Sequence, residues 1–257
     1  MDRRLFLSLG LAALAPRKAR AAAPPWRARL LVGAFHGGRH HIGLAITLEP
    51  GWKTYWRVPG EGGVPPEVTA SGINLAEATV SLPLPQRFSN DDGSETIGFH
   101  DEVVFPVAVT AKDASLPIEL DFRIFFGVCR GICIPADYAT AITLDPAKPG
   151  PDAVALSLWQ AKVPEPVTAE AAPVTQAELD VSADRPALVL TLARPLRDIF
   201  VEAPGTAFFH KPDFTRAAGK AWLAIADLKD VMTLRGQILR LTLDDQGRGV
   251  EQSITIP

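Results

Sequence analysis

The sequence has only two cysteines, Cys129 and Cys133, and three residues separate them rather than the two of a Cys-x-x-Cys motif. The βαβ pattern that surrounds such a motif in thioredoxin-like proteins is also missing. Methionine is equally scarce, because Met1 and Met232 are the only two and neither is close to the cysteines in sequence. A thioredoxin-type site is therefore not predicted. The cysteine pair could be a structural disulfide, a metal-binding pair or a redox couple.

Long apolar runs and basic clusters are lacking as well. A membrane-spanning helix needs about 20 apolar residues, and the sequence predicts no such segment. Residues 1–21 carry five basic residues and one acidic residue, so their removal changes the formal net charge from −3 to −7. An acidic chain without basic clusters is a poor candidate for binding nucleic acid or anionic lipid. We therefore predict a chain with no nucleic-acid partner and no transmembrane segment.

The N-terminus has the organisation of a secretory signal peptide over residues 1–21. A charged start is followed by the apolar run Leu5–Ala15 and by small residues at a cleavage candidate, Ala19–Ala21. Arg3 and Arg4 also fit the twin-arginine type of bacterial signal, so both export routes stay open. Either route leads to an oxidising space, the periplasm, where a cysteine pair can persist as a disulfide.

The fold class predicted from the rest of the chain is all-β, with two immunoglobulin-like β-sandwich domains. Short β-type runs recur with turn signals between them. In the segment 118–126, every second residue from Ile118 to Phe126 is apolar, and Glu119, Asp121 and Arg123 lie between them. This period of two predicts one buried strand face and one exposed face.

The predicted domain boundary lies in a segment rich in proline and alanine. We expect a first domain over 24–147, a linker over 148–173 and a second β-sandwich over 174–257. One short helix is expected in the linker, with Val154, Ala155, Leu158 and Ala161 on the face that docks. The second domain has no cysteine, and its last two strands are predicted to form a hairpin through the turn Gln246–Gly249.

The spacing of the two cysteines constrains their geometry. In a straight strand, residues four positions apart lie about 13 Å apart, beyond the roughly 7 Å at which two Cα atoms can be bridged. A disulfide therefore requires a turn, which Gly131 permits, while Pro135 restricts the exit from it. We expect Cys129 at the end of one strand and Cys133 at the start of the next, at the tip of a hairpin.

Three functions of this pair can be weighed. As a structural disulfide, a loop of about five residues contributes only about 2 kcal/mol. As a copper site, the pair lacks the His and Met that follow the second cysteine in cupredoxin-type patterns, since Asp137 and Thr140 stand at those positions. The histidines His36, His40 and His41 are expected to be exposed residues of another hairpin. No metal ligand set and no cofactor are predicted.

Redox exchange needs only a reachable disulfide, an attacking thiolate and a partner. Arg130 would favour a thiolate electrostatically and Asp137 would oppose it, so the residues alone do not determine the thiol pKa values.

Three stretches resemble a known family: GVCRGICIP at 127–135, GWKTYWRVPGEGGVPPEV at 51–68 and PQRFSNDDGSETIGFHDEVVFPV at 85–107. They are similar to the periplasmic N-terminal domain of the DsbD and ScsB thiol-disulfide reductases, and closer to the ScsB type. The resemblance covers residues 25–145 and extends more loosely into the second β domain. It implies an immunoglobulin-like domain that accepts two electrons from a membrane partner and passes them to oxidised periplasmic proteins.

The resemblance also implies roles for individual residues. Cys133 would form the mixed disulfide with partners and Cys129 would resolve it. A cap loop shields the pair in the family and would correspond to RFSNDDGSE, with Phe88 as its aromatic residue. Other residues implied at the site are Asp91 and Asp92 in the cap, and Tyr55, Trp56 and Pro135 near the pair.

The electron donor and the client follow from the same resemblance. Family members continue into a membrane transporter and a thioredoxin-like domain, whereas this sequence ends at Pro257. We therefore expect a membrane-embedded or thioredoxin-like electron donor on another chain, and an oxidised periplasmic protein as the client. The alternatives are a copper-binding or copper-tolerance module that uses the same cysteines, and a β-sandwich interaction protein with a structural disulfide.

Overall fold

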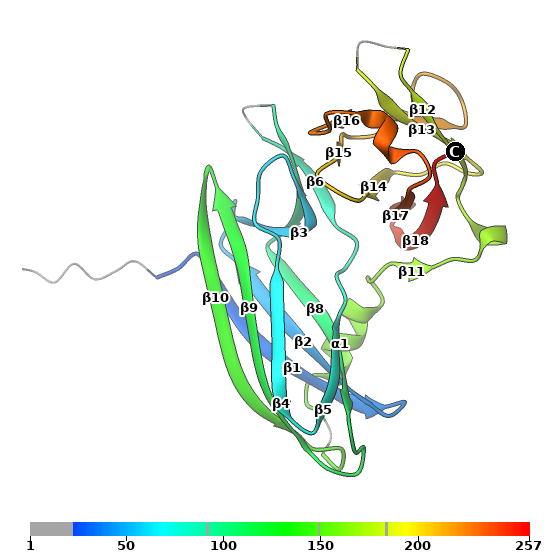
Figure 1. The fold of residues 1–257 in the computed structure, drawn as a ribbon. Helices are drawn as coiled ribbons and strands as arrows, with labels where there is room; N and C mark the ends of the chain where they lie inside the picture. The colour runs from blue at the N-terminus through cyan, green and yellow to red at the C-terminus, as the bar shows by residue number, and fades with distance from the viewer. Residues whose placement is uncertain (1–22, 91–92, 149, 183–184) are drawn as a thin grey trace, which may run out of the picture.

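The computed structural model describes residues 23–90, 93–148, 150–182 and 185–257 and contains two β-sandwich domains (Figure 1). The predicted all-β fold class, with two immunoglobulin-like domains and one short helix, is confirmed. The predicted signal peptide, residues 1–21, lies outside the described residues. Among the described residues, no helix is both long and apolar enough to cross a membrane.

The first domain packs a four-stranded sheet against a six-stranded sheet. The smaller sheet has the strand order β1-β2-β8-β5, and the larger has the order β10-β9-β3-β7-β6, with β4 pairing to β9. The strands are β1 (Trp26–His36), β2 (Arg39–Leu48), β3 (Lys53–Gly60), β4 (Glu67–Ile73), β5 (Leu75–Val80), β6 (Gln86–Ser89), β7 (Glu95–His100), β8 (Glu102–Ala111), β9 (Ile118–Arg130) and β10 (Ile132–Leu144).

Strand β9 shows why these sequences form sheets with one buried face. Its alternate residues from Ile118 to Phe126 are buried in the core, whereas Glu119, Asp121 and Arg123 between them are exposed. Burial of such side chains contributes about 1.5–3 kcal/mol each. The period-two prediction for this segment is confirmed, and the strand directs the chain to Cys129.

The second domain has two four-stranded sheets. Their strand orders are β11-β18-β17-β14 and β12-β13-β16-β15. The elements are β11 (Glu165–Pro166), a 3₁₀ turn (Ala169–Ala171), β12 (Val174–Asp180), β13 (Ala187–Leu192), β14 (Asp198–Glu202), β15 (Phe208–Phe209), β16 (Lys220–Ala226), a second 3₁₀ turn (Val231–Leu234), β17 (Ile238–Asp245) and β18 (Arg248–Thr255). The predicted final hairpin is confirmed; Gln246 and Gly247 form its turn, both with positive φ.

The connecting segment contributes to both domains. Helix α1 (Ala153–Gln160) packs on the smaller sheet of the first domain, and β11 pairs with β18 of the second. The predicted docking face of α1 is wrong, because Val154 and Leu158 are exposed and Leu156 is the buried residue. Leu156 enters a hollow that glycines leave in the sheet, and a Cβ added at Gly33 or Gly43 would lie 2.7 or 2.6 Å from its methyl groups.

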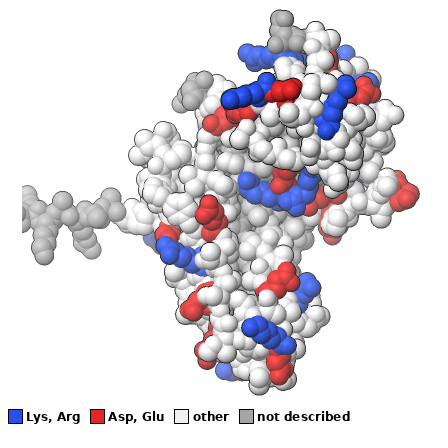
Figure 2. Space-filling view, in the orientation of Figure 1, with Lys and Arg blue, Asp and Glu red and all other residues white. Residues whose placement is uncertain are grey.

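The second domain lies against the end of the first domain that carries β3 and β6 (Figure 1). Phe200 and Phe208, on β14 and β15, belong to the same buried apolar cluster as the core of the first domain. On the face drawn in Figure 2, the basic and acidic side chains of the described residues lie interspersed. The two domains therefore share an apolar contact, and Arg57 and Arg87 of the first domain also pair with carboxylates of the second.

Candidate functional site

The two cysteines lie opposite one another at the tip of the β9–β10 hairpin. The antiparallel register pairs Cys129 with Cys133 directly, and Gly131 makes the turn between them with φ of 74°. Directly paired residues of neighbouring antiparallel strands have Cα atoms about 4.5–5.5 Å apart, within the range that a disulfide bridges. Both residues are free thiols here, with their sulfur atoms 2.8 Å apart. The predicted placement at a hairpin tip is confirmed.

The two thiols differ in exposure. Cys133 is exposed to solvent, whereas Cys129 is half-buried. Ile132, which precedes Cys133 at the tip, leaves 67% of its surface exposed. A macromolecule that approaches the hairpin tip therefore meets Cys133 and an apolar side chain first.

Tyr55 of β3 supplies a hydroxyl group to the cysteine pair. Its Oη atom lies 3.1 Å from Sγ of Cys133, and its ring is buried. Burial, followed by the contacts with Cys129 and Cys133, raises the pKa of Tyr55 far above its ordinary value. The phenol therefore stays protonated and can donate a hydrogen bond to a thiolate.

Glycines hold the Tyr55 ring in place. A Cβ added at Gly127 would lie 3.1 Å from the Tyr55 ring and 2.9 Å from Cβ of Val64, and a Cβ added at Gly63 would overlap the ring from the loop after β3. Gly127 precedes Cys129 by two residues on β9, so it shares the face of the strand from which the cysteine projects. The tyrosine therefore fits a slot that only glycine leaves open.

Lys53 provides the cation beside the pair. On β3, Lys53 lies directly opposite Cys129 of β9. Its Nζ atom donates to Oδ1 of Asn90 at 2.5 Å and to Oγ1 of Thr96 at 2.7 Å. Lys53 and Tyr55 are two residues apart on one strand and therefore share a face. Sequence reasoning overlooked Lys53, although the same alternation that was applied to β9 would have placed it beside Tyr55.

The pKa of the Cys129 thiol is raised, chiefly by burial and next by its hydrogen bond with Cys133. The Tyr55 hydroxyl and the Lys53 ammonium act in the opposite direction and favour the thiolate. The expected influence of Asp137 is not found, because its carboxylate forms an ion pair with Arg123 further along the hairpin. Arg130 lies over the Trp52 ring, 5.1 Å from its centroid.

A groove of about 840 Å³ contains both cysteines. Its walls come from the loop before β3, the β3 strand and its following loop, the hairpin tip, and the β6–β7 hairpin. We call β6 and β7 the cap hairpin. Phe88 of the cap hairpin lines the groove, with the Lys53 ammonium 5.5 Å from its ring centroid and the His100 ring 5.8 Å away in an edge-on arrangement.

The other residues that the resemblance placed at the site are Asp91, Asp92, Trp56 and Pro135. Asp91 and Asp92 lie outside the described residues. Trp56 points away from the cysteines because it follows Tyr55 on the strand; it is fully buried and packs against Phe200 of the second domain at a centroid distance of 5.8 Å. Pro135 lies two residues beyond Cys133 on β10, is exposed and pairs with Gly127.

The histidine-rich hairpin lies at the opposite end of the first domain from the cysteines (Figure 1). His36 and His41 stack with ring centroids 4.0 Å apart, and His41 contacts Gln160 of α1. The expectation that all three histidines are exposed holds only for His36, because His40 is buried against Phe35 and His41 is half-buried. Within residues 23–257, apart from the three short gaps, no three or more His, Cys, Asp or Glu residues form a group able to hold a metal ion.

Comparison with known families and structures confirms the resemblance. Residues 21–145 match the family described as "Thiol:disulfide interchange protein DsbD, N-terminal", and residues 162–257 match a domain of unknown function, DUF8393. The first of these matches supports a role in thiol-disulfide interchange for the first domain. No curated protein matches the chain in sequence.

Among solved structures, the chain is similar to the N-terminal periplasmic domain of ScsB from Proteus mirabilis. The two are 25% identical with a TM-score of 0.71, and the match covers 93% of this chain and 96% of that one. The YadV chaperone matches over 90% of this chain and 99% of its own, at 10% identity and a TM-score of 0.28, which is too low to support any conclusion. The likeness to ScsB thus extends over both domains.

Proposed function

We propose that this chain, whose first domain is of the DsbD N-terminal type, is a periplasmic thiol-disulfide exchange protein that acts through Cys129 and Cys133. The observation that carries the proposal is the pair of directly opposed thiols at an exposed hairpin tip, with the Tyr55 hydroxyl 3.1 Å from Sγ of Cys133. The similarity to a periplasmic domain of ScsB supports the compartment.

The exchange reaction starts from the dithiol. The Cys133 thiolate attacks one sulfur of a client disulfide, forms a mixed disulfide and releases the second client sulfur as a thiolate. The Cys129 thiolate then attacks Sγ of Cys133, and the Cys129–Cys133 disulfide forms as the first client sulfur leaves. Two electrons pass to the client, which takes up two protons, and an incoming dithiol from the donor restores the reduced pair by the same steps in reverse.

The unequal exposure of the two sulfurs supports this division of roles. Cys133 is exposed and can reach a client disulfide, whereas Cys129 is half-buried and lies 2.8 Å from Sγ of Cys133. The raised pKa of Cys129 keeps it protonated while Cys133 engages the client. Lys53 opposes that rise and favours the resolving thiolate when it forms.

Tyr55 stabilises the charge that develops on Cys133. A hydrogen bond to a charged group contributes about 1.5–3 kcal/mol, and the buried phenol is fixed in its slot before the reaction begins. The hydroxyl therefore favours the thiolate as nucleophile and also as leaving group during reduction by the donor.

The partners follow from this chemistry. The client is an oxidised periplasmic protein whose disulfide can enter the groove at the hairpin tip. The donor is a membrane-embedded or thioredoxin-like dithiol. Exposed Ile132 and the apolar rings of Trp52 and Phe88 at the groove support docking of a protein surface rather than of a small polar substrate.

Trapping of the mixed disulfide tests this function. In Cys129→Ser, a client bound through Cys133 cannot be released, so a covalent adduct should accumulate during periplasmic expression and dissociate with dithiothreitol. Cys133→Ser is the matched control, because it retains one thiol of the pair but lacks the exposed one. Equal adduct formation in both variants, or none in either, would refute the proposed roles.

A further inference from the structure

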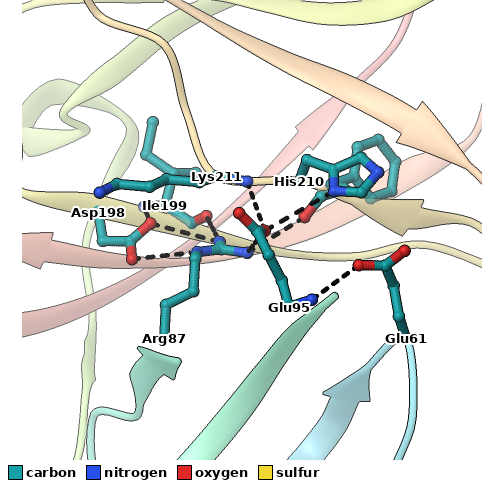
Figure 3. A network of polar contacts seen from close by, with 8 residues as sticks. Glu61, Arg87, Glu95, Asp198, Ile199, His210 and Lys211 are labelled. Atoms are coloured by element: carbon teal, nitrogen blue, oxygen red, sulfur yellow. Dashed lines mark hydrogen bonds and ion pairs between the residues drawn. The ribbon is translucent and has the colours of Figure 1, made fainter. Parts of the chain in front are cut away.

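The cap hairpin is attached to the second domain through Arg87 of β6 (Figure 3). The guanidinium group reaches Asp198 through Nε and Nη2, both at 3.3 Å, and donates to the carbonyl oxygen of Ile199 at 3.1 Å and of Phe209 at 3.4 Å. Its Nη1 atom also donates to Glu95 of β7 at 3.1 Å. All three guanidinium nitrogens are thus engaged, mostly by the second domain.

Glu95 provides a second attachment on the neighbouring strand. Its Oε2 atom accepts a hydrogen bond from the backbone N–H of Lys211 at 2.9 Å and lies 3.8 Å from Nδ1 of His210. The backbone N–H of Glu95 donates to Glu61 at 2.7 Å, which ties β7 to the loop after β3 (Figure 3). Both strands of the cap hairpin are therefore connected to the second domain.

The Arg87 contacts are shielded from water. The Arg87 side chain is only 5% exposed, and burial raises the pKa of Asp198 while Arg87 acts to lower it. A buried ion pair gains little net stability over an apolar pair, but removal of one charge leaves the other uncompensated. Loss of the Asp198 charge is therefore expected to release the strand that Arg87 anchors.

The next residue along β6 faces the redox site. Successive residues of a strand point to opposite sides, so Arg87 reaches the second domain while Phe88 lines the groove with the cysteines. Asn90, just beyond β6, accepts the hydrogen bond from Lys53. The strand that contacts the second domain, together with the residue just beyond it, thus also lines the groove that contains the thiol pair.

A second arginine makes an equivalent connection that does not involve the cap hairpin. Arg57 of β3 binds Glu202 at 2.7 Å and Glu251 at 2.6 Å in the second domain. The two arginines have similar partners, but only Arg87 lies on the cap hairpin. This difference separates a role in cap position from a role in holding the domains together.

We propose that the second domain is a positioning domain for the redox site, and that it holds the cap hairpin at the groove that contains Cys129 and Cys133 through Asp198, Arg87 and Glu95. This proposal rests on the proposed function, in which a client disulfide must reach Cys133. Asp198, in a domain without cysteines, thereby controls how readily Cys133 is reached.

The experiment measures alkylation of Cys133 by iodoacetamide in the full chain with Cys129→Ser, so that one thiol is present. Asp198→Asn should increase the alkylation rate roughly threefold to tenfold, a range typical of coupling between connected sites. Glu251→Gln is the matched control, because it removes a carboxylate of the second domain that pairs with Arg57, and its rate should stay within twofold of the parent. Glu95→Gln should act in the same direction as Asp198→Asn.

A double-mutant cycle with Phe88→Ala identifies the route of the effect. If the second domain acts through the cap, Asp198→Asn should add nothing to the rate once the Phe88 ring is gone. Equal rates for Asp198→Asn and Glu251→Gln, or an Asp198→Asn effect that persists in full with Phe88→Ala, would overturn the proposal. Alkylation needs no partner, so this outcome is independent of whether mixed disulfides are trapped with a client.

Discussion

The two domains share a β-sandwich architecture but use their buried polar side chains differently. In the first, Thr54 donates to the carbonyl oxygen of Gly127 at 2.8 Å, next to the slot that holds Tyr55. In the second, buried Gln252 bonds both the N–H and the carbonyl of Val174, which only joins two strands. Buried polar side chains of the first domain therefore help to shape a site. Those of the second domain stabilise its own sheets and its contacts with the first domain.

This difference shows how one architecture can serve both as reactive module and as support. The chemistry-bearing groups of the first domain lie where β3, β9 and the cap hairpin meet, whereas the second domain presents carboxylates and carbonyls to arginines of the first. Variants in the first domain should thus alter exchange directly. Variants in the second should act through the cap or leave exchange unchanged.

The largest effect among variants that retain both cysteines is expected for Tyr55→Phe. Loss of the hydroxyl removes a hydrogen bond to a charged sulfur, so the rate of disulfide exchange with a model protein disulfide should fall about tenfold or more. Tyr138→Phe is the matched control, because Tyr138 is the only other tyrosine and packs against the core. Similar rates for both variants would remove Tyr55 from the mechanism.

A smaller effect is expected for Gly127→Ala. The added methyl group would press on Val64 and on the Tyr55 ring, and such overpacking costs about 1–3 kcal/mol in the free energy of unfolding. Urea denaturation measures that loss, and exchange should slow because the tyrosine is displaced. Gly62→Ala, also at the groove, has no neighbour within 4 Å of the added Cβ and should leave both unchanged.

Lys53→Met should shift the pH dependence of Cys129. Burial raises the pKa of this thiol and Lys53 lowers it, so the thiolate forms at higher pH once the ammonium is lost. In Cys133→Ser, the rate of iodoacetamide alkylation should rise with pH through a midpoint above the usual thiol value of about 8.5. Adding Lys53→Met should move that midpoint further up; an unchanged or lower midpoint would contradict the assigned role.

The smallest effect compares two exposed isoleucines, one in each domain. Ile132 is 67% exposed at the hairpin tip and Ile238 is 64% exposed on β17. Neither change to serine should alter the free energy of unfolding by more than about 0.5 kcal/mol. Ile132→Ser should weaken exchange with a protein client about twofold to fivefold by raising KM, whereas Ile238→Ser should leave KM unchanged. The effect on KM is small because only the contact energy of one apolar side chain is lost.

Local patterns predicted the strands and the cysteine geometry. Alternation in 118–126 and the turn at Gly131 are contained in adjacent residues, so the sequence was sufficient there. The docking face of α1 was missed because Leu156 is selected by a hollow over two glycines of other strands. A helical pattern alone carries no information about the surface that receives it.

The charged contacts between domains could not be predicted for a related reason. Arg87 and Asp198 are 111 residues apart in the sequence, and each stands in a strand with no motif that links it to the other. Trp56 was expected near the cysteines from the family resemblance, but strand alternation sends its ring and that of Tyr55 to opposite faces. Long-range partners emerge only once both sandwiches are folded and packed.

The reduction potential of the Cys129–Cys133 pair tests the central claim most directly. The purified protein would be equilibrated in glutathione buffers, and the dithiol and disulfide forms quantified by alkylation and mass. We predict one two-electron transition between roughly −120 and −270 mV, the range of thiol-disulfide exchange proteins. A pair that stays oxidised below about −300 mV would be a structural disulfide and would contradict the account.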